Sequence, residues 1–540
     1  MNVNRYPGAA TLSLLALSVL WGCNASDEPA ADYGPTATPA TYDPPEEDDS
    51  DLDGGSEEPN LPPEQEDAFF RAMPAASDRY VFVVNPERDT LSKINATTRA
   101  VYTLPVGLHP TQVLTGALNP NLAVVLNEGD ATLSLLDVSS DTLDTLPIHP
   151  DTNYMALSAD GKYVITWFEA NVEGADNSVD GVRSYSNISV VFTGDEKQAP
   201  TSTPLAVALN PRGATYIPSS NQALVLCDGV VAQVYLSAKP TVRLIPLTDN
   251  IDEKLTVAEM KVSPDGRFAF LRLSSSAELM VVSLQAESVT EAVSRVSLSA
   301  PATDMDLASN NLILVDRAQQ ELLIFDAQDP EAPPRTLQTP SNQLVGSLVI
   351  SPSLNRAVLY TTLTAQDIQD TPYEDMPLDR FSLWDLSTDQ IKLYDLVKPV
   401  ESVSMAETSA GDVVTFIHQA SASSDLTAFN KKNALSHFYV EDGQVLPAVL
   451  EAPLKAQATV PGGQYGFAIL ENVNSVLVVD YAIRQMRSLA LQSRPVFVGV
   501  LTGTTEGYVS QEHELGRISF VNPATLQATT ITGFELNAQP

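Results

Sequence analysis

Two histidines occupy corresponding places in the chain, and each is followed by a proline. His109 lies in Gly-Leu-His-Pro and His149 lies in Ile-His-Pro, 40 residues further on. Imidazole nitrogens bind zinc and similar metals, but such a site needs three or four protein ligands. The other three histidines have no evident reason to converge on this pair. We therefore predict no metal ligands, no catalytic residues and no cofactor.

Charged residues also gather in three segments that are longer than their counterparts elsewhere, residues 169–186, 365–380 and 419–434. Arg494 precedes a proline, as the two histidines do. Binding residues often lie on long loops that a rigid scaffold positions. The candidate binding face consists of His109, His149, Asp176, Asp180, Asp370, Glu374 and Arg494. The alternative is that the three segments are tolerated surface insertions.

Short strands must position these residues. Residues 122–167 hold four strand-like runs separated by polar turns, after which the pattern starts again. Four short strands per roughly 40–45 residues is the period of a propeller blade. Ten stretches match the second strand of this unit: residues 80–85, 122–127, 163–167, 223–227, 268–271, 312–316, 357–360, 413–417, 467–470 and 507–510.

The expected fold is therefore all-β, a β-propeller of four-stranded blades over residues 68–540. Ten repeat units are counted, and seven to ten blades are compatible with the spacing. One closed assembly is preferred to two smaller rings because no linker-like break follows residue 70. The first inner strand is predicted near residues 69–73, before a turn at 74–79. Residues 287–297 are the only fair helix candidate, and a turn is an equal alternative.

Two classes of loop share one face of a propeller. One class joins the second strand of a blade to the third, and the three long segments belong to it. The other class joins the outer strand to the next blade, near the central channel, and holds His109, His149 and Arg494. All candidate binding residues are thus expected on one face.

An Asp or Asn ends the third strand in six units. The positions are Asn95, Asp137, Asp326, Asp385, Asp480 and Asn522. A short side chain of this kind can accept a hydrogen bond from the backbone two residues on and so start a turn. We therefore predict that these residues are structural.

Several of these stretches resemble the YVTN family of bacterial β-propellers, whose repeat contains VYVTN, VSVID, TIPVG and SPDG. Residues 80–95 with 104–110, and residues 260–270 around Ser-Pro-Asp-Gly, carry the resemblance, which extends over residues 68–532. The resemblance implies a propeller fold. It also implies relatives that are lactonases or that carry a quinone cofactor.

The N-terminus resembles a bacterial lipoprotein signal over residues 1–22. Arg5 precedes an apolar run at residues 9–21, and Leu20, Gly22 and Cys23 fit the pattern in which the cysteine receives lipid. Asparagine rather than aspartate follows the cysteine, which favours the outer membrane. An ordinary secretory signal is the alternative.

Residues 23–67 are predicted to be a disordered acidic tether. The segment 24–67 contains eight prolines and almost no large apolar residues, so it cannot bury enough surface to offset its ordering entropy. If Cys23 is lipidated, the other cysteine, Cys227, has no partner. Cys227 lies in a buried-strand pattern and is predicted to be an inert thiol.

The chain is acidic throughout. Its formal net charge is -38, and residues 71–540 alone hold 53 acidic and 29 basic residues. Nucleic acid is therefore excluded as a partner, because phosphate binding needs clustered Lys and Arg. Cations, basic proteins and neutral ligands remain open.

These observations lead us to expect a lipoprotein of the outer membrane, either periplasmic or surface-exposed. We expect it to be a binding or scaffolding propeller for a protein or glycan partner, and not an enzyme. A self-associating structural subunit of a surface assembly is the first alternative. A lactonase-like or quinone-dependent enzyme is the second, and the scarcity of histidines and basic residues argues against it.

Overall fold

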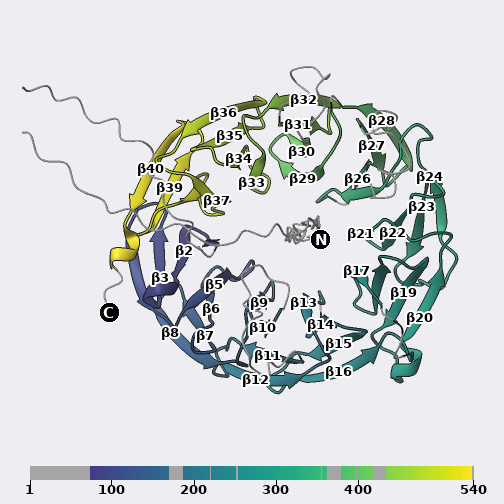
Figure 1. Cartoon of the computed structure of the whole chain (residues 1–540), viewed down its shortest axis with the longest axis horizontal. Helices are drawn as coiled ribbons and strands as arrows, with labels where there is room; N and C mark the ends of the chain where they lie inside the picture. The colour runs from purple at the N-terminus through teal and green to yellow at the C-terminus, as the bar shows by residue number, and fades with distance from the viewer. Residues whose placement is uncertain are drawn as a thin grey trace, which may run out of the picture. The chain divides into compact units, whose positions relative to one another are not determined.

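Ten consecutive antiparallel sheets of four strands form a ring in the computed structural model (Figure 1). The structure describes residues 73–169, 186–218, 220–250, 253, 255–353, 355–361, 379–396, 398–418 and 433–537. Residues 1–65 are a separate unit, which lies outside these ranges. In every sheet the strands pair in chain order, with the first strand nearest the centre. The fold is a ten-bladed β-propeller, so the fold predicted from the repeat is confirmed.

The first five blades follow one another along the chain. Their strands are β1 (Ala75–Ser77), β2 (Tyr80–Asn85), β3 (Thr90–Asn95) and β4 (Val101–Pro105); β5 (Pro110–Thr115), β6 (Leu122–Asn127), β7 (Thr132–Asp137) and β8 (Thr142–Pro147); β9 (Tyr154–Leu157), β10 (Tyr163–Trp167), β11 (Asn187–Phe192) and β12 (Thr201–Ala206); β13 (Arg212–Tyr216), β14 (Gln222–Cys227), β15 (Val230–Tyr235) and β16 (Thr241–Pro246); β17 (Val257–Val262), β18 (Phe268–Leu273), β19 (Glu278–Ser283) and β20 (Val293–Ser297).

The last five blades complete the ring. Their strands are β21 (Asp304–Ala308), β22 (Asn311–Asp316), β23 (Glu321–Asp326) and β24 (Arg335–Gln338); β25 (Ser347–Ile350), β26 (Arg356–Tyr360), β27 (Arg380–Asp385) and β28 (Gln390–Asp395); β29 (Ser402–Thr408), β30 (Gly411–His418), β31 (Ala434–Tyr439) and β32 (Gln444–Val449); β33 (Leu454–Thr459), β34 (Tyr465–Leu470), β35 (Ser475–Asp480) and β36 (Gln485–Ala490); β37 (Pro495–Val500), β38 (Gly507–Gln511), β39 (Arg517–Asn522) and β40 (Gln527–Thr532).

The hydrophobic cores lie between neighbouring blades, because the central strands bury both of their faces. Every residue of β6 is buried, as expected for a strand covered on both sides. One apolar cluster joins Phe82 of blade 1 to Val125 of blade 2. Another joins Trp167 of blade 3 to Ala232 of blade 4. All ten stretches predicted as second strands are strands in the structure.

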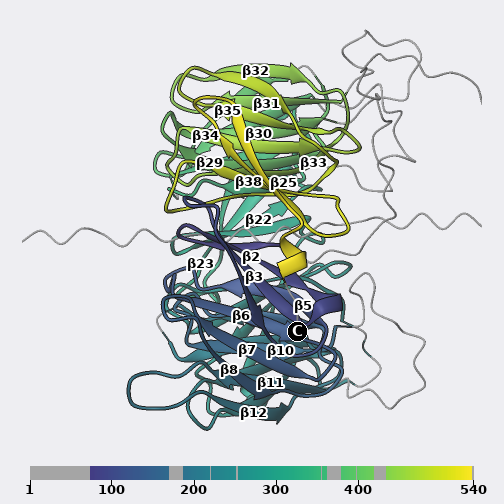
Figure 2. The same cartoon turned by 90° about the vertical axis from the view of Figure 1, so that its left-hand side faces the viewer.

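Blades 10 and 1 close the ring without exchanging a strand. The four strands of blade 1 are the first four in the chain, and the four strands of blade 10 are the last four. The Arg99 guanidinium of blade 1 donates to both carboxylate oxygens of Glu506, at 3.0 and 2.8 Å. It also lies 4.4 Å from the ring centre of Phe520. The short helix η4 (Phe534–Asn537) follows β40 and packs Phe534 into the cluster at this junction. Figure 2 shows this C-terminal segment beside β2 and β3.

The predicted structural role of the residues that end the third strands is confirmed. Each accepts one or two backbone N–H bonds from the turn that follows, at Asn95, Asp137, Asp326, Asp385, Asp480 and Asn522. These side chains therefore hold the turn to the outer strand.

The prediction of the first inner strand is wrong. The strand β1 occupies residues 75–77, within the segment predicted as a turn, and pairs with β2; Met73 lies before it, outside any strand. Asp78 adopts φ 51°, which allows a tight turn directly after Ser77. The small residues Ala75 and Ala76 give no hydrophobic pattern, so the strand was not visible in the sequence.

The helix alternative for residues 287–297 is also wrong. A three-residue 3-10 turn, η2 (Val289–Glu291), precedes β20 there. The side chain of Ser288 accepts the N–H of Thr290 and so starts this turn. The first blade has a similar turn, η1 (Pro86–Arg88). No helix within the described ranges is long and apolar enough to cross a membrane.

Candidate functional site

The two classes of loop meet on one face of the ring, as predicted. The backbone N–H of His109, between β4 and β5, donates to the carboxylate of Asp89 at 2.7 Å. Asp89 lies between β2 and β3. The carbonyl of His109 accepts the N–H of Glu128, between β6 and β7, at 3.1 Å. Because every blade has the same strand order, this face carries both classes of loop around the whole ring. We call it the insertion face.

The three long segments start and end on the insertion face. They join β10 to β11 in blade 3, β26 to β27 in blade 7 and β30 to β31 in blade 8. The predicted binding residues Asp176, Asp180, Asp370 and Glu374 lie outside the described residues, as does Cys23. The structure therefore fixes the blades to which the segments attach.

His109 and His149 lie in equivalent connections between blades, but their contacts are with different neighbouring residues. His109 is exposed and has φ 48°. The Nδ1 atom of His149 lies 2.8 Å from the carbonyl oxygen of Pro150, and its backbone N–H donates to the hydroxyl of Ser189 at 2.8 Å. In the part of the chain that the structure describes, no group of three or more potential metal ligands occurs.

Arg494 lies in the connection between blades 9 and 10, away from both histidines along the ring. Its guanidinium forms an ion pair with Glu512 at 2.6 Å and donates to the side-chain oxygen of Asn472 at 2.8 Å. The described candidate residues thus share a face without forming one cluster.

A charged network that the sequence reading missed lies on the inner strands β17 and β21. The Lys261 ammonium lies 3.1 Å from Glu259 and 3.0 Å from Asp306. Arg272 contacts Glu259 at 3.3 Å and donates to the carbonyl of Ala302 at 3.2 Å. Lys261 and Asp306 lie 45 residues apart, and only the packing of blade 5 on blade 6 brings them together.

Asp304 links this network to blade 7. Its two carboxylate oxygens accept the backbone N–H groups of Leu348, in β25, and Met305, both at 2.9 Å. Burial, followed by the nearby Glu259 carboxylate, raises the pKa of Asp304 to about 6. A carboxyl with this pKa exchanges its proton near neutral pH, as functional carboxyls often do.

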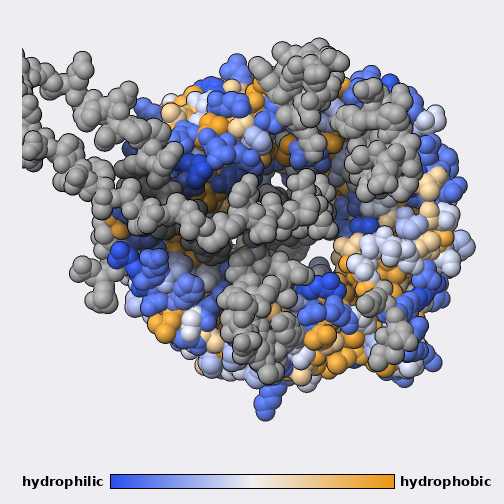
Figure 3. All heavy atoms as spheres, in the orientation of Figure 1, coloured by the Kyte–Doolittle hydropathy of each residue, from blue (hydrophilic) through white to orange (hydrophobic). Residues whose placement is uncertain are grey.

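An aromatic platform lies in blade 3 at the start of the inner strand. Tyr154, the first residue of β9, pairs with Trp167, the last residue of β10, and their ring centres are 4.9 Å apart. The Trp167 indole N–H donates to the carboxylate of Glu169 at 2.9 Å. The Tyr154 side chain is 40% exposed, whereas Trp167 is 1% exposed. The inner strands lie nearest the centre of the ring (Figure 1). Figure 3 shows an opening there, which we call the channel, with hydrophilic residues along parts of its edge.

A histidine and a serine also meet in blade 8. The Nε2 atom of His418 lies 2.8 Å from the hydroxyl of Ser436, and Nδ1 lies 2.9 Å from the carbonyl of Pro399. Such a pair can activate a nucleophile. However, blade 1 has Asn85 at the position of His418, and Asn85 donates to the buried Ser92 at 3.1 Å. His418 therefore replaces an asparagine in a repeated structural pair, and its pKa is lowered mainly by burial.

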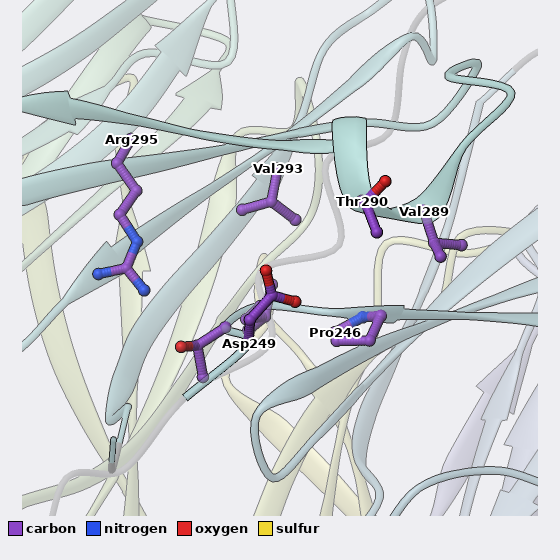
Figure 4. Close-up of a pocket in the computed structure, with 8 residues that line it drawn as sticks. Pro246, Asp249, Val289, Thr290, Val293 and Arg295 are labelled. Atoms are coloured by element: carbon purple, nitrogen blue, oxygen red, sulfur yellow. The ribbon is translucent and has the colours of Figure 1, made fainter. Parts of the chain in front are cut away.

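A cavity of about 300 Å³ lies on the outer rim between blades 4 and 5 (Figure 4). Its lining residues are Pro246, Leu247, Thr248, Asp249, Val289, Thr290, Val293 and Arg295. Arg295 is already paired with Glu253 at 2.8 Å and with Glu278 at 3.2 Å. Because the Arg295 cation is already paired with two carboxylates, the cavity does not present it as a free charge to a ligand.

No protein-family model and no curated protein matches the sequence. Among solved structures, the chain is similar to dihydro-heme d1 dehydrogenase NirN in complex with DHE, with 11% identity, a TM-score of 0.44, and coverage of 79% of this chain and 77% of that one. It is also similar to apo AztD from Citrobacter koseri, with 12% identity, a TM-score of 0.40, and coverage of 71% and 96%. A eukaryotic initiation factor gives 10% identity and a TM-score of 0.48 over 74% and 93%. At these identities the likeness concerns the fold.

Proposed function

We propose that this protein is a lipid-anchored propeller of YVTN-type repeats that binds or scaffolds a protein or glycan partner at the bacterial outer membrane. One observation carries the proposal. Three long segments, in blades 3, 7 and 8, attach to the same face of a closed ring. Loops on a rigid scaffold are favoured places for binding.

The fold itself does not require these long segments. In blade 4, β14 ends at Cys227 and β15 begins at Val230, so two residues are enough to join the second and third strands. The blades also pack tightly against one another, which gives the insertion face a firm base. These two facts favour a binding role over tolerated insertions.

The proposed anchor is the lipid on Cys23, followed by an acidic tether over residues 23–67. Such a tether would hold the ring away from the membrane, on the periplasmic or the external side. The acidity of the ring favours neutral or basic partners and disfavours nucleic acid.

Two other functions are kept as alternatives. The first is a structural subunit of a surface assembly, in which copies of the ring pack together. The second is an enzyme, because the resemblance includes lactonases and quinone-dependent relatives. If the protein is an enzyme, Asp304 is the described residue best suited to act as a general acid or base, since its pKa lies near neutrality.

The test is to isolate the intact protein from its native envelope under gentle crosslinking and to identify its neighbours. Three variants each have one long segment, 170–185, 362–378 or 419–432, replaced by the Asp-Gly turn of blade 4. A control variant carries Lys197→Glu and Lys239→Glu, which are exposed residues in connections between third and outer strands.

We expect a defined partner with the wild type and with the control variant, and its loss from at least one replacement variant. Retention of the partner by all three replacement variants would contradict the proposal. Crosslinks only between copies of the chain would favour the structural subunit. A stoichiometric divalent metal without any neighbour would favour the enzyme.

A further inference from the structure

We infer that Tyr154 and Glu169 form a subsite for one ring of a neutral glycan at the mouth of the channel in blade 3. The inference rests on the proposed function, because it assigns a ligand class to part of the insertion face. Tyr154 begins the inner strand β9, and Glu169 follows β10 on the same face.

The Tyr154 ring packs on a buried side chain and is partly exposed to solvent. It packs on Trp167 with 46° between the ring planes, and Trp167 is itself fixed in the core between blades 3 and 4. The Tyr154 side chain nevertheless remains 40% exposed. A rigid aromatic surface of this kind loses little conformational entropy when a ligand stacks on it.

The carboxylate beside this ring is also positioned in advance. Asn153 binds the backbone of Glu169 on both sides: its amide N–H donates to the Glu169 carbonyl at 2.9 Å, and its oxygen accepts the Glu169 N–H at 2.7 Å. Gln112 of blade 2 donates to the Asn153 carbonyl at 2.7 Å. One Glu169 oxygen accepts from Trp167, which leaves the second oxygen and the Tyr154 hydroxyl without a hydrogen bond to any described residue.

This combination matches the two surfaces of a sugar ring. The C–H groups of a sugar stack on the negative face of an aromatic ring, while its hydroxyls donate strong hydrogen bonds to a carboxylate. An anionic sugar is disfavoured because the Glu169 carboxylate would repel it. Burial raises the pKa of Tyr154, and the nearby charge of Glu169 raises it further. A few fixed polar groups beside an apolar surface are typical of small-ligand sites.

The aromatic pair is not required by the propeller fold. At the corresponding positions, blade 2 pairs Gln112 with Leu126 and blade 4 pairs Arg212 with Leu226. Blade 3 therefore departs from these blades at the place where a stacking residue would face the channel mouth.

Tryptophan fluorescence provides a local readout, because the ring contains only Trp167 and Trp384. In a Trp384→Phe background, emission reports on Trp167. We would titrate cellohexaose, maltohexaose and chitohexaose at millimolar concentrations, and repeat each titration by calorimetry with the wild-type protein. Thermal unfolding checks that each variant is folded.

We expect at least one hexasaccharide to bind and to change the Trp167 emission. Tyr154→Ala should weaken its affinity by about tenfold or more, the loss expected for an aromatic stacking surface. Glu169→Gln should weaken binding, and Tyr154→Phe should retain most of it. Tyr102→Ala is the matched control, since Tyr102 is 48% exposed on an outer strand of blade 1, and it should bind as the wild type does.

The inference fails if no hexasaccharide binds the wild type, or if Tyr154→Ala binds equally well. It also fails if Tyr154→Ala loses a co-isolated protein while no sugar binds, which would assign the platform to a protein partner. Partner capture by the insertion face is measured separately, so a negative sugar titration leaves the proposed function standing.

Discussion

Asp304 makes the stability of the ring depend on pH. The folded pKa is about 6 and the ordinary value is 3.8, so the folded protein holds this proton more tightly than the unfolded chain does. The tighter proton binding stabilises the folded protein fully at pH values below the pKa of Asp304 in the unfolded chain. This stabilisation is lost as the pH rises through the pKa of Asp304 in the folded protein. A shift of about two units is equivalent to ~3 kcal/mol. The free energy of unfolding should therefore fall by ~3 kcal/mol between about pH 3 and pH 7 because of this carboxyl.

The assay compares urea unfolding of the wild type and Asp304→Asn across this range. Other titrating groups are common to both proteins and cancel in the difference. The asparagine cannot accept both the Leu348 and Met305 N–H groups, which adds an offset that does not depend on pH. We expect the wild-type stability, relative to the variant, to decline by ~3 kcal/mol and then to level off above pH 7.

The neighbouring carboxylate provides a second check. Glu259 is the next cause of the raised pKa after burial, so Glu259→Gln should lower the pKa of Asp304. The pH-dependent difference, measured in the Glu259→Gln background, should then be smaller. A difference that is constant with pH, or that grows as pH rises, would refute this reasoning.

Three further predictions concern residues that hold the ring together. Arg99→Ala removes the paired carboxylate contacts between blades 10 and 1 and should lower the free energy of unfolding by ~2 kcal/mol. Arg79→Ala, at an exposed residue, should leave the free energy of unfolding close to the wild-type value. Equal effects of the two substitutions in urea unfolding would contradict the role of Arg99 in closing the ring. His418→Asn should keep the hydrogen bond to Ser436 and lower the free energy of unfolding by less than ~1 kcal/mol, while His418→Ala should lower it by ~2 kcal/mol in the same assay. A larger loss of stability with asparagine than with alanine would be inconsistent with a structural pair. Cys227 is buried, and burial raises its thiol pKa to about 12. Mass spectrometry should therefore find maleimide on this residue only after the protein is unfolded. Rapid labelling of the native protein would argue against an inert core thiol.

The blades could be predicted from the sequence because their second strands are buried on both faces. Strands such as β6 and β10 become short apolar runs between polar turns, and the runs recur at a regular spacing. The residues that end the third strands could also be predicted, because Asp and Asn act locally on the next turn. The inner strand β1 could not be found, because its small residues are only partly buried and show no alternation.

The candidate site was predicted less completely because its contacts cross between blades. The places of His109, His149 and Arg494 follow from loop order, and the structure confirms that they share a face. Lys261 meets Asp306 only through the register of two neighbouring blades, which periodicity does not reveal. The role of Tyr154 was likewise hidden, although an aromatic residue at the start of an inner strand was a signal that could have been used.

The most direct test of the account is to measure how much partner is captured from the native envelope by the wild type and by the three segment-replacement variants. The ring should remain folded in each variant, since two residues join the same strands in blade 4. The account predicts a defined partner that is captured by the wild type and lost when at least one long segment is replaced. Undiminished capture by all three variants would contradict the claim that the insertion face is where this propeller binds.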